Sequence, residues 1–406
     1  MYMYFNMKLP GLEEMKITKT EEIEGSFHIH VQLPKKPHKC PSCGEITERI
    51  HDYRVQKIQH LKLFERRTYI FYRKRRYRCK CGKRFVENNN IVYRYQRHTV
   101  EWNQALGFRV IKGKNFKDTA AQFHTSSNTA MRRFDNVSAG KLREVKALPR
   151  VIAIDEYKGD TNKGKYQTII GNGETGEPLD ILPDRSVKTV KKYLQEKGEK
   201  VEIVIMDMSH SFKSAVQQAL GNPIIIADRF HFCRYIYWAL ERVRRRVQKE
   251  FHPYDRKKCK RMKHVFYKHY EALSAKQHWY LERYLGLSED LRTAYGLKES
   301  YRTWFEEAKK IGKDNMKEVK EGLYQFYTQV KDAGLEEFEK AIQTLQNWQP
   351  EILNSFAFGY SNGFIEGLNN QTKVIKRNAF GFKRYDRLRL RVLLHHQFKS
   401  VANSIG

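Results

Sequence analysis

The sequence is poor in cysteine, poor in acidic residues relative to basic ones, and free of long apolar runs. Its 406 residues hold only six cysteines, which is too few for a disulfide scaffold. No apolar run approaches the length of a membrane span, and the first residues lack the charged and apolar segments of a secretion signal. These absences predict a soluble intracellular protein in a reducing compartment, without a membrane partner.

Basic residues dominate the charge balance. Lys and Arg number 77 against 46 Asp and Glu, which gives a formal net charge of +31. A charge of this sign and size predicts a polyanionic partner, and nucleic acid is the first choice. An anionic membrane surface is the weaker alternative, because the charge is spread along the whole chain. With 40% hydrophobic residues, the chain can build the cores of two to four domains.

Four of the six cysteines form two close pairs. Cys40 and Cys43 stand in CPSCG, and Cys79 and Cys81 stand in CKCGKRF. Each pair is followed by a glycine of the kind that a tight turn needs, and four thiolates so arranged complete a tetrahedral zinc site. We therefore expect one structural Zn²⁺, with four unligated thiols as the alternative.

The segment between the cysteine pairs alternates aromatic and basic residues. Residues 66–78 read RRTYIFYRKRRYR. In a strand, such alternation places one kind of side chain on each face, so the aromatic face would pack while the basic face meets phosphates. An ordinary solvated face is the alternative.

Three short helices are predicted after the polar residues 88–90. Residues 99–112 carry an apolar stripe of Trp102, Leu106 and Val110, and two shorter helices follow in FKDTAAQF and SSNTAMRRFDNV. Two short helices joined by a tight polar turn indicate a helix-turn-helix, with a generic three-helix packing unit as the alternative. The last helix would present four residues to a DNA groove. These are Asn128, Thr129, Arg132 and Arg133.

Three acidic residues stand in settings that suit metal-dependent chemistry. Asp155 lies within a buried strand, RVIAIDEY, and Asp207 ends the apolar run VEIVIMD. Glu366 lies in a predicted helix, NGFIEGLNNQTKVIKR. Three such carboxylates can hold two divalent ions that act on a phosphodiester. Taken singly, each acid has a plainer explanation: a buried acid held by backbone donors, a helix cap, and a surface residue.

The order of elements after residue 150 predicts a ribonuclease-H-like core. The strand with Asp155 is followed by a hairpin at 158–165, two more strands, a helix, VEIVIMD and then NPIIIAD. This order gives an antiparallel start with parallel additions. The chain from 235 to 355 then lacks strand-like alternation, so we expect a large helical insertion before the helix of Glu366. We expect the insertion to clamp DNA, for example through the basic cluster 244–246.

A family resemblance runs in order along nearly the whole chain. The chain resembles the ISL-three family of bacterial insertion-sequence transposases in CPSCG, YRCKCGKRF, the helix-turn-helix, IAIDEY, VIMDMSHSF, ADRFHFCRY and YSNGFIEGLNNQTKVIKRNAFGF. The resemblance implies a DDE transposase, which cleaves and transfers DNA strands at the ends of a mobile element with Mg²⁺ or Mn²⁺. It implies Asp155, Asp207 and Glu366 as the catalytic acids and metal ligands. Asp228 and His231 match a related Asp-x-x-His signature.

Several expectations follow from this family and these residues. Asp207 is preferred over Asp228 as the second acid, because it ends the strand after the first crossover helix. Asp228 and His231 would then orient the core or the DNA without holding the metal. Polar and cationic residues recur along the helix of Glu366, where they would bind phosphates near the cleaved bond. These residues are Asn369, Asn370, Lys373 and Arg377.

The expected partners are double-stranded DNA, as terminal inverted repeats and target DNA, and further copies of the chain assembled on it. The expected location is the bacterial cytoplasm, at the nucleoid. Five parts are expected along the chain: a zinc-binding domain, a helix-turn-helix domain, a first part of the core, the helical insertion, and the closing helix with the C-terminus. Their limits are 1–90, 91–149, 150–234, 235–355 and 356–406. A DNA-binding regulator would leave the acids idle, and a nuclease without transposition would not need two DNA-reading modules.

Overall fold

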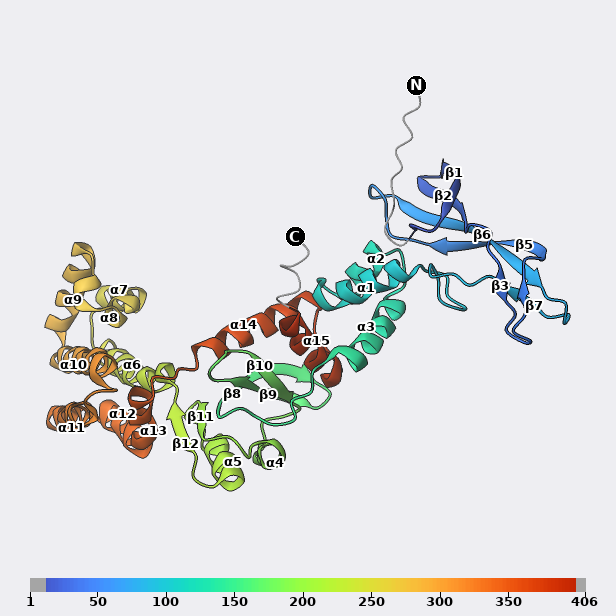
Figure 1. The fold of residues 1–406 in the computed structure, drawn as a ribbon. Coiled ribbons are helices and arrows are strands. Elements are labelled where there is room, and N and C mark those ends of the chain that lie inside the picture. Colours follow the sequence, from blue (N-terminus) through green and yellow to red (C-terminus); the bar gives the residue numbers. More distant parts are fainter. Residues whose placement is uncertain (1–11, 399–406) are drawn as a thin grey trace. The chain divides into compact units, whose positions relative to one another are not determined.

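The computed structural model describes residues 12–398, and these residues fall into two compact units (Figure 1). The N-terminal unit runs to Leu142, with short additions at 378–380 and from 397. The C-terminal unit holds residues 143–377 and 381–396. Within the described residues, no helix is both long enough and apolar enough to cross a membrane.

A twisted β-sheet forms the first half of the N-terminal unit. Its strands follow the order β1-β2-β6-β5, with β7 paired to β6, and a small hairpin of β3 and β4 stands apart. Apolar residues from β2, β5 and β6 make its core, as alternation predicts for a sheet with one buried face. The strands are β1 (Lys16–Ile23), β2 (Ser26–Gln32), β3 (His38–Lys39), β4 (Ile46–Thr47), β5 (Ile50–Gln59), β6 (Arg67–Arg78) and β7 (Arg84–Val86).

The basic residues of β6 do not all face solvent. Arg75 is 6% exposed, and its guanidinium lies 3.2 Å from the buried carboxylate of Glu87. Tyr72 donates its hydroxyl hydrogen to the same carboxylate at 2.7 Å. Arg75 is therefore part of a buried ion pair, and the prediction that the basic residues of this strand meet phosphates is wrong for this position.

Three helices complete the N-terminal unit at the predicted places. They are α1 (Val100–Lys112), α2 (Phe116–Gln122) and α3 (Ser127–Lys141). Thr99, Asn115 and Ser126 cap them, each accepting a hydrogen bond from a backbone N–H of the first turn. The predicted stripe of Trp102, Leu106 and Val110 is fully buried.

A mixed five-stranded sheet is the centre of the C-terminal unit. Its order is β10-β9-β8-β11-β12, in which the first three strands are antiparallel and the last two run parallel to β8. The predicted antiparallel start with parallel additions is confirmed. The predicted hairpin is shorter than expected, because β8 continues to Thr161 and β9 begins at Gly164. The strands are β8 (Val151–Thr161), β9 (Gly164–Asn172), β10 (Pro178–Leu182), β11 (Ile203–Met206) and β12 (Ile224–Ala227).

Helices cover both faces of this sheet (Figure 1). Ile152 and Ile154 of β8 face α4 (Val187–Lys197) and α5 (His210–Leu220). Val151 and Ala153 face α14 (Gly363–Asn378) and α15 (Tyr385–Gln397) on the other side. Because successive strand residues point to opposite faces, Asp155 shares the face of Val151 and Ala153, toward α14.

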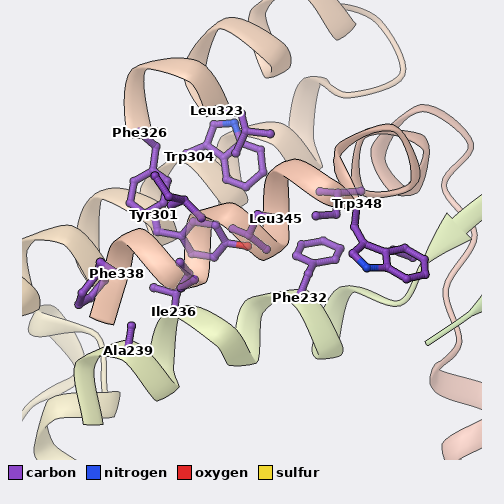
Figure 2. Packing of buried hydrophobic residues seen from close by; sticks show 14 of the residues in the cluster. Phe232, Ile236, Ala239, Tyr301, Trp304, Leu323, Phe326, Phe338, Leu345 and Trp348 are labelled. Atoms are coloured by element: carbon purple, nitrogen blue, oxygen red, sulfur yellow. The ribbon is translucent and has the colours of Figure 1, made fainter. Parts of the chain in front are cut away.

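A helical insertion joins β12 to α14, beginning with α6 directly after β12 rather than at 235. Its core is continuous with the α4–α5 face of the sheet, and Figure 2 shows the aromatic packing around Phe232, Tyr301 and Phe326. The helices are α6 (Arg229–Val247), α7 (Pro253–Arg261), α8 (Lys263–Tyr267), the 3₁₀ turn η1 (Tyr270–Ala272), α9 (Ala275–Leu287), α10 (Glu289–Ile311), α11 (Met316–Ala333), α12 (Glu336–Asn347) and α13 (Gln349–Ala357).

The arginine cluster 244–246 is structural rather than a free DNA clamp. Arg244 is 2% exposed and pairs with Glu241. Arg246 joins α6 to two other helices through Asp290 at 2.7 Å and Glu337 at 2.8 Å. Removing this cluster would disturb folding, so the predicted use of the cluster as a DNA clamp is wrong for Arg244 and Arg246.

Candidate active site and metal centres

Asp155 is held between its own strand and α14. Its Oδ1 accepts a hydrogen bond from the backbone N–H of Glu156 at 2.7 Å, and its Oδ2 accepts one from Nδ2 of Asn369 at 2.6 Å. Asn369 is 5% exposed and follows Glu366 by three residues, so it lies on the same side of α14. Asn369 was predicted to bind phosphates, but in the structure its side-chain amide contacts the carboxylate of Asp155.

Asp207 and Asp228 follow the neighbouring parallel strands β11 and β12. The carboxyl ends of parallel strands meet at one edge of a sheet, so their side chains come together there. His231, in the first turn of α6, places Nε2 3.0 Å from Oδ1 of Asp207 and 3.7 Å from Oδ2 of Asp228. Potential ligand atoms of Asp207, Asp228 and His231 all lie within 4.8 Å of one another.

Glu366 reaches the same place from the first turn of α14. The beginning of this helix packs closely on β9, where a Cβ atom on Gly171 would lie 2.7 Å from the Phe364 ring. A glycine is therefore needed at 171. A hollow of about 560 Å³ is lined by Glu366 together with Asp155, Asp207, Asp228 and His231.

The ionisation of these groups reflects crowding of acids in a partly buried place. Burial, and then the charge of Asp207, raise the pKa of Asp155 to about 7. Burial also raises the pKa of Asp228. Burial alone would lower the pKa of His231, but the Asp207 carboxylate outweighs it and the pKa is raised. The site thus holds more negative charge than its own cations neutralise.

The donor set fits divalent metal ions. Oδ1 of Asp207 is buried and makes no regular hydrogen bond among the described residues, although Nε2 of His231 lies 3.0 Å away. Carboxylate oxygens are the ligands that Mg²⁺ and Mn²⁺ prefer, and a bound cation would favour the ionised form of Asp155.

Of the remaining residues that were predicted to bind DNA on α14, one lines the hollow of the acids and two do not. Lys373 lines the hollow of the acids, whereas Asn370 and Arg377 are exposed on α14 and are absent from its lining. Two arginines that the sequence did not single out also line it, Arg185 and Arg234. The sequence could have indicated Arg234, because it follows His231 by about one helical turn in ADRFHFCRY. In the structure it donates a hydrogen bond to Nδ1 of His231 at 3.1 Å. Arg185 lies in a loop with no local signal.

The raised pKa values predict a stability that falls with pH when no divalent ion is added. A group whose folded pKa lies above its unfolded value stabilises the fold fully below the unfolded pKa and loses this effect as pH rises through the folded pKa. For Asp155 this window runs from about 4 to 7. We expect the melting temperature of the C-terminal unit to fall as pH rises through this window, and Asp155→Asn to flatten the fall.

Differential scanning calorimetry of the two proteins without added Mg²⁺ would test this expectation. Adding Mg²⁺ at the alkaline end should raise the melting temperature of the native protein more than that of Asp155→Asn. Identical pH profiles for the two proteins would contradict it.

The four predicted cysteines form one cluster in the N-terminal unit. Sγ of Cys40 lies 3.7 Å from Sγ of Cys81, and Sγ of Cys43 lies 3.5 Å from Sγ of Cys79. All four sulfur atoms lie within 4.8 Å of one another. A tetrahedron with Zn–S bonds of about 2.3 Å separates its sulfurs by about 3.8 Å, so the cluster fits Zn²⁺. Backbone N–H groups, that of Cys43 first, lower the pKa of Cys40 to about 7. The backbone N–H of Glu45 lowers the pKa of Cys43, but hydrogen bonds with the neighbouring thiols of Cys79 and Cys81 outweigh it and raise that pKa to about 12.

The predicted DNA-binding residues of α3 differ in their exposure and in their contacts within the protein. Asn128 and Arg132 are exposed, and Thr129 is half-buried. Arg133 donates a hydrogen bond to Asn103 of α1, which ties α3 to the first helix. Together with the segment 95–98, Thr129, Arg132 and Arg133 line a hollow of about 440 Å³.

Three family models match the chain in order. Residues 36–81 match the zinc-finger of transposase IS204/IS1001/IS1096/IS1165, and residues 87–138 match the helix-turn-helix domain of transposase family ISL3. Residues 152–392 match the transposase model of this family, over more than half of the chain. The first match contains the cysteine cluster, the second contains most of α3, and the third contains all the acids of the hollow.

Two curated relatives are similar over very different lengths. The transposase for insertion sequence element IS1001 from Bordetella parapertussis is 24% identical over 374 residues, which is 88% of each chain. A protein named ATP-dependent protease from Lactococcus lactis subsp. lactis is 41% identical over 61 residues, 15% of this chain and 20% of its own length. The first similarity is long enough to include parts of both units.

Proposed function

Because the chain belongs to the ISL3 family of DNA transposases, we propose that it cuts and rejoins DNA by the DDE route, with Asp155, Asp207 and Glu366 as the catalytic acids. The observation that carries this proposal is the convergence of the three carboxylates on one hollow from β8, β11 and α14. The strand order β10-β9-β8-β11-β12 supports a ribonuclease-H-like core.

The three acids would hold a pair of Mg²⁺ or Mn²⁺ ions. Such ions stabilise the attacking and leaving oxygens of an in-line displacement at phosphorus. Asn369 keeps Oδ2 of Asp155 in place, so the carboxylate is oriented before DNA arrives. Lys373 lines the hollow as an exposed point charge that donates a hydrogen bond to Asn370 at 3.3 Å and suits a phosphate of the cleaved strand.

Asp228 and His231 would act on Asp207 rather than on the DNA. His231 lies against the Asp207 carboxylate and accepts a hydrogen bond from Arg234, which fixes the side of the ring that faces Asp207. Asp228 and His231 lie close enough to Asp207 to share a metal ion with it, whereas Asp155 and Glu366 are not part of that close group. Asp228 is therefore the carboxylate that competes for the role of Asp207.

The N-terminal unit would recognise the terminal inverted repeats. We assign the zinc-binding part to 1–90 and the helix-turn-helix to 91–149, the core to 150–228 with 356–406, and the helical insertion, from the start of α6, to 229–355. The Zn²⁺ would have a structural role, since four thiolates leave no open coordination position. Transposition joins two ends to a target, so assembly of two or more copies on DNA is part of the proposal.

One assay tests the proposed chemistry. The purified protein is incubated with end-bearing DNA and Mg²⁺, and new 3′ ends and joined products are mapped. Cleavage at the element end followed by joining to target DNA is expected. Cleavage without joining would favour a nuclease, and binding without cleavage would favour a regulator.

Arg132→Ala should weaken binding of end DNA and flatten its salt dependence. Arg132 is exposed, and each lost phosphate contact reduces the slope of log K against log salt by about 0.9. Anisotropy titrations at several salt concentrations measure both effects. Arg133→Ala serves as the contrast, because Arg133 binds Asn103 and its loss should also lower the melting temperature of the N-terminal unit. An unchanged slope for Arg132→Ala, with relaxed sequence preference, would instead indicate a base contact.

A further inference from the structure

The helical insertion contains a second hollow, of about 830 Å³. It lies between the C-terminal half of α6, the link at 248–252, α7 and the first residue of α8. It shares no lining residue with the hollow of the acids. Its chemistry is therefore separate from the proposed cleavage site.

Basic side chains dominate this hollow. Among the described residues that line it, Glu241 is the one acid, and both of its oxygens are already occupied. Arg244 donates to the two oxygens of Glu241 at 2.8 Å each, and Arg245 donates to one of them at 2.8 Å. These contacts lower the pKa of Glu241 to about 2 despite its burial, so the acid stays ionised and paired.

Five further cations line the hollow without a carboxylate partner in the described part of the chain. All five are exposed, and none takes part in an ion pair. They are Lys249, Arg256, Lys257, Lys260 and Lys263. The hollow thus carries an uncompensated charge of about five, on the order expected for a surface that follows several phosphates.

The helix beneath these cations is firmly fixed. Asp255, the one acid of α7, turns inward, where its two oxygens bind Arg283 at 2.9 to 3.0 Å. Cys259 is fully buried next to Arg244. The inner side of α7 is therefore used for packing. Arg256 and Lys260 lie one turn apart on its exposed side, where their like charges repel each other. Like charges at this spacing destabilise a helix, and an external anion would relieve the repulsion.

We propose that this hollow binds the phosphate backbone of duplex DNA, independently of base sequence, in addition to the contacts of the helix-turn-helix. Lysine side chains are point charges that suit phosphates, and phosphate contacts position a protein without reading bases. The lining offers no free stacking platform for unpaired bases, since Phe251 is its one aromatic residue and stacks on Tyr284. The proposal rests on DNA as the substrate, but not on the assignment of the catalytic acids.

A matched pair of triple variants of the full-length chain tests the proposal. The first removes three cations of the hollow, Arg256→Gln, Lys257→Gln and Lys260→Gln. The control removes three exposed lysines from α10 and α11, Lys310→Gln, Lys317→Gln and Lys320→Gln. Both lose the same net charge. Binding to a duplex of random sequence is followed by anisotropy at several NaCl concentrations without Mg²⁺, so cleavage does not enter the measurement.

The hollow variant should lose about 2.7 from the slope of log K against log salt, which is three contacts at about 0.9 each, and the control should lose less than about 1. Equal losses in the two variants would overturn the proposal. So would a hollow variant that binds DNA normally but no longer binds inorganic tripolyphosphate, because the site would then serve a small anion.

A measurement on the native chain covers the case in which the triple variant misfolds. Acetylation of lysines is read by mass spectrometry with and without duplex DNA. Lys257 and Lys260 should be protected by the DNA, whereas Lys310 and Lys320 should not. Failure of this protection would overturn the proposal. Whether Asp207→Asn loses cleavage is a separate question, which tests the catalytic assignment and leaves the proposal for this hollow unchanged.

Discussion

Asp207→Asn should abolish donor cleavage and strand transfer together while end DNA is still bound. An amide keeps the shape of the side chain but removes the charge that would hold a divalent ion next to Asp155. The loss should exceed the roughly 10- to 100-fold effect of a residue that only supports a metal ligand. Asp155→Asn and Glu366→Gln should behave in the same way. Cleavage of labelled end DNA and joined products are measured on one gel, and binding is measured by anisotropy.

Asp228→Asn is the decisive comparison. Asp228 lies within reach of the same metal as Asp207, yet we expect it to retain about a tenth to a hundredth of the activity, most visibly with Mn²⁺. Glu174→Gln, which removes an exposed acid paired with Arg150 in the same unit, should cut DNA normally. An active Asp207→Asn with an inactive Asp228→Asn would move the second catalytic acid one strand along.

Cys79→Ser should remove Zn²⁺ from the protein and unfold the region around the cysteine cluster. Cys79 is 3% exposed and its sulfur lies 3.5 Å from that of Cys43, and a serine hydroxyl is not among the ligands of structural zinc sites. Binding of structural Zn²⁺ supplies about 10 to 16 kcal/mol in zinc-finger peptides, as much as the whole stability of a typical domain. Metal analysis should fall from one Zn²⁺ per chain to none, and the melting transition of the N-terminal unit should be lost or strongly lowered.

Cys233→Ser is the matched control for the zinc prediction. Cys233 lies on α6 in the other unit, where its sulfur accepts a hydrogen bond from Tyr301 at 3.7 Å. This variant should keep its Zn²⁺, and the transition of the C-terminal unit should remain in Cys79→Ser. A native protein without Zn²⁺ under reducing conditions would contradict the prediction directly.

Local patterns in the sequence predicted the elements and the faces that they bury. The run RVIAIDEY predicted a buried strand that contains Asp155, and the stripe of Trp102 identified the inner side of α1. These predictions succeeded because each depends on neighbours along the chain. The mixed sheet followed from the order of the strands and of the crossover helices between them.

Contacts between distant residues could not be predicted in this way. Arg75 is buried because the pairing of β6 with β7 brings Glu87 next to it, and nothing in the basic run itself indicates that partner. The contact of Asn369 with Asp155 joins residues 214 positions apart, so it depends on how α14 lies on the sheet. Trp304 has the aromatic surface of a stacking residue, but its Nε1–H donates to the backbone of Val319 and its ring is buried.

The helical insertion separates the proposed acids in time as well as in sequence. During synthesis, Asp155 and Asp207 leave the ribosome with their strands, and Glu366 follows 366 − 207 = 159 residues later. At ~5 to 20 residues per second, the delay is roughly 8 to 32 s. Within that interval the insertion is made, and α13 comes back to β12, where Asn354 donates to the backbone of Ile225 at 2.9 Å. A chain interrupted before residue 366 would therefore lack the third proposed acid, and under the proposed function its N-terminal unit would bind an element end without cutting it.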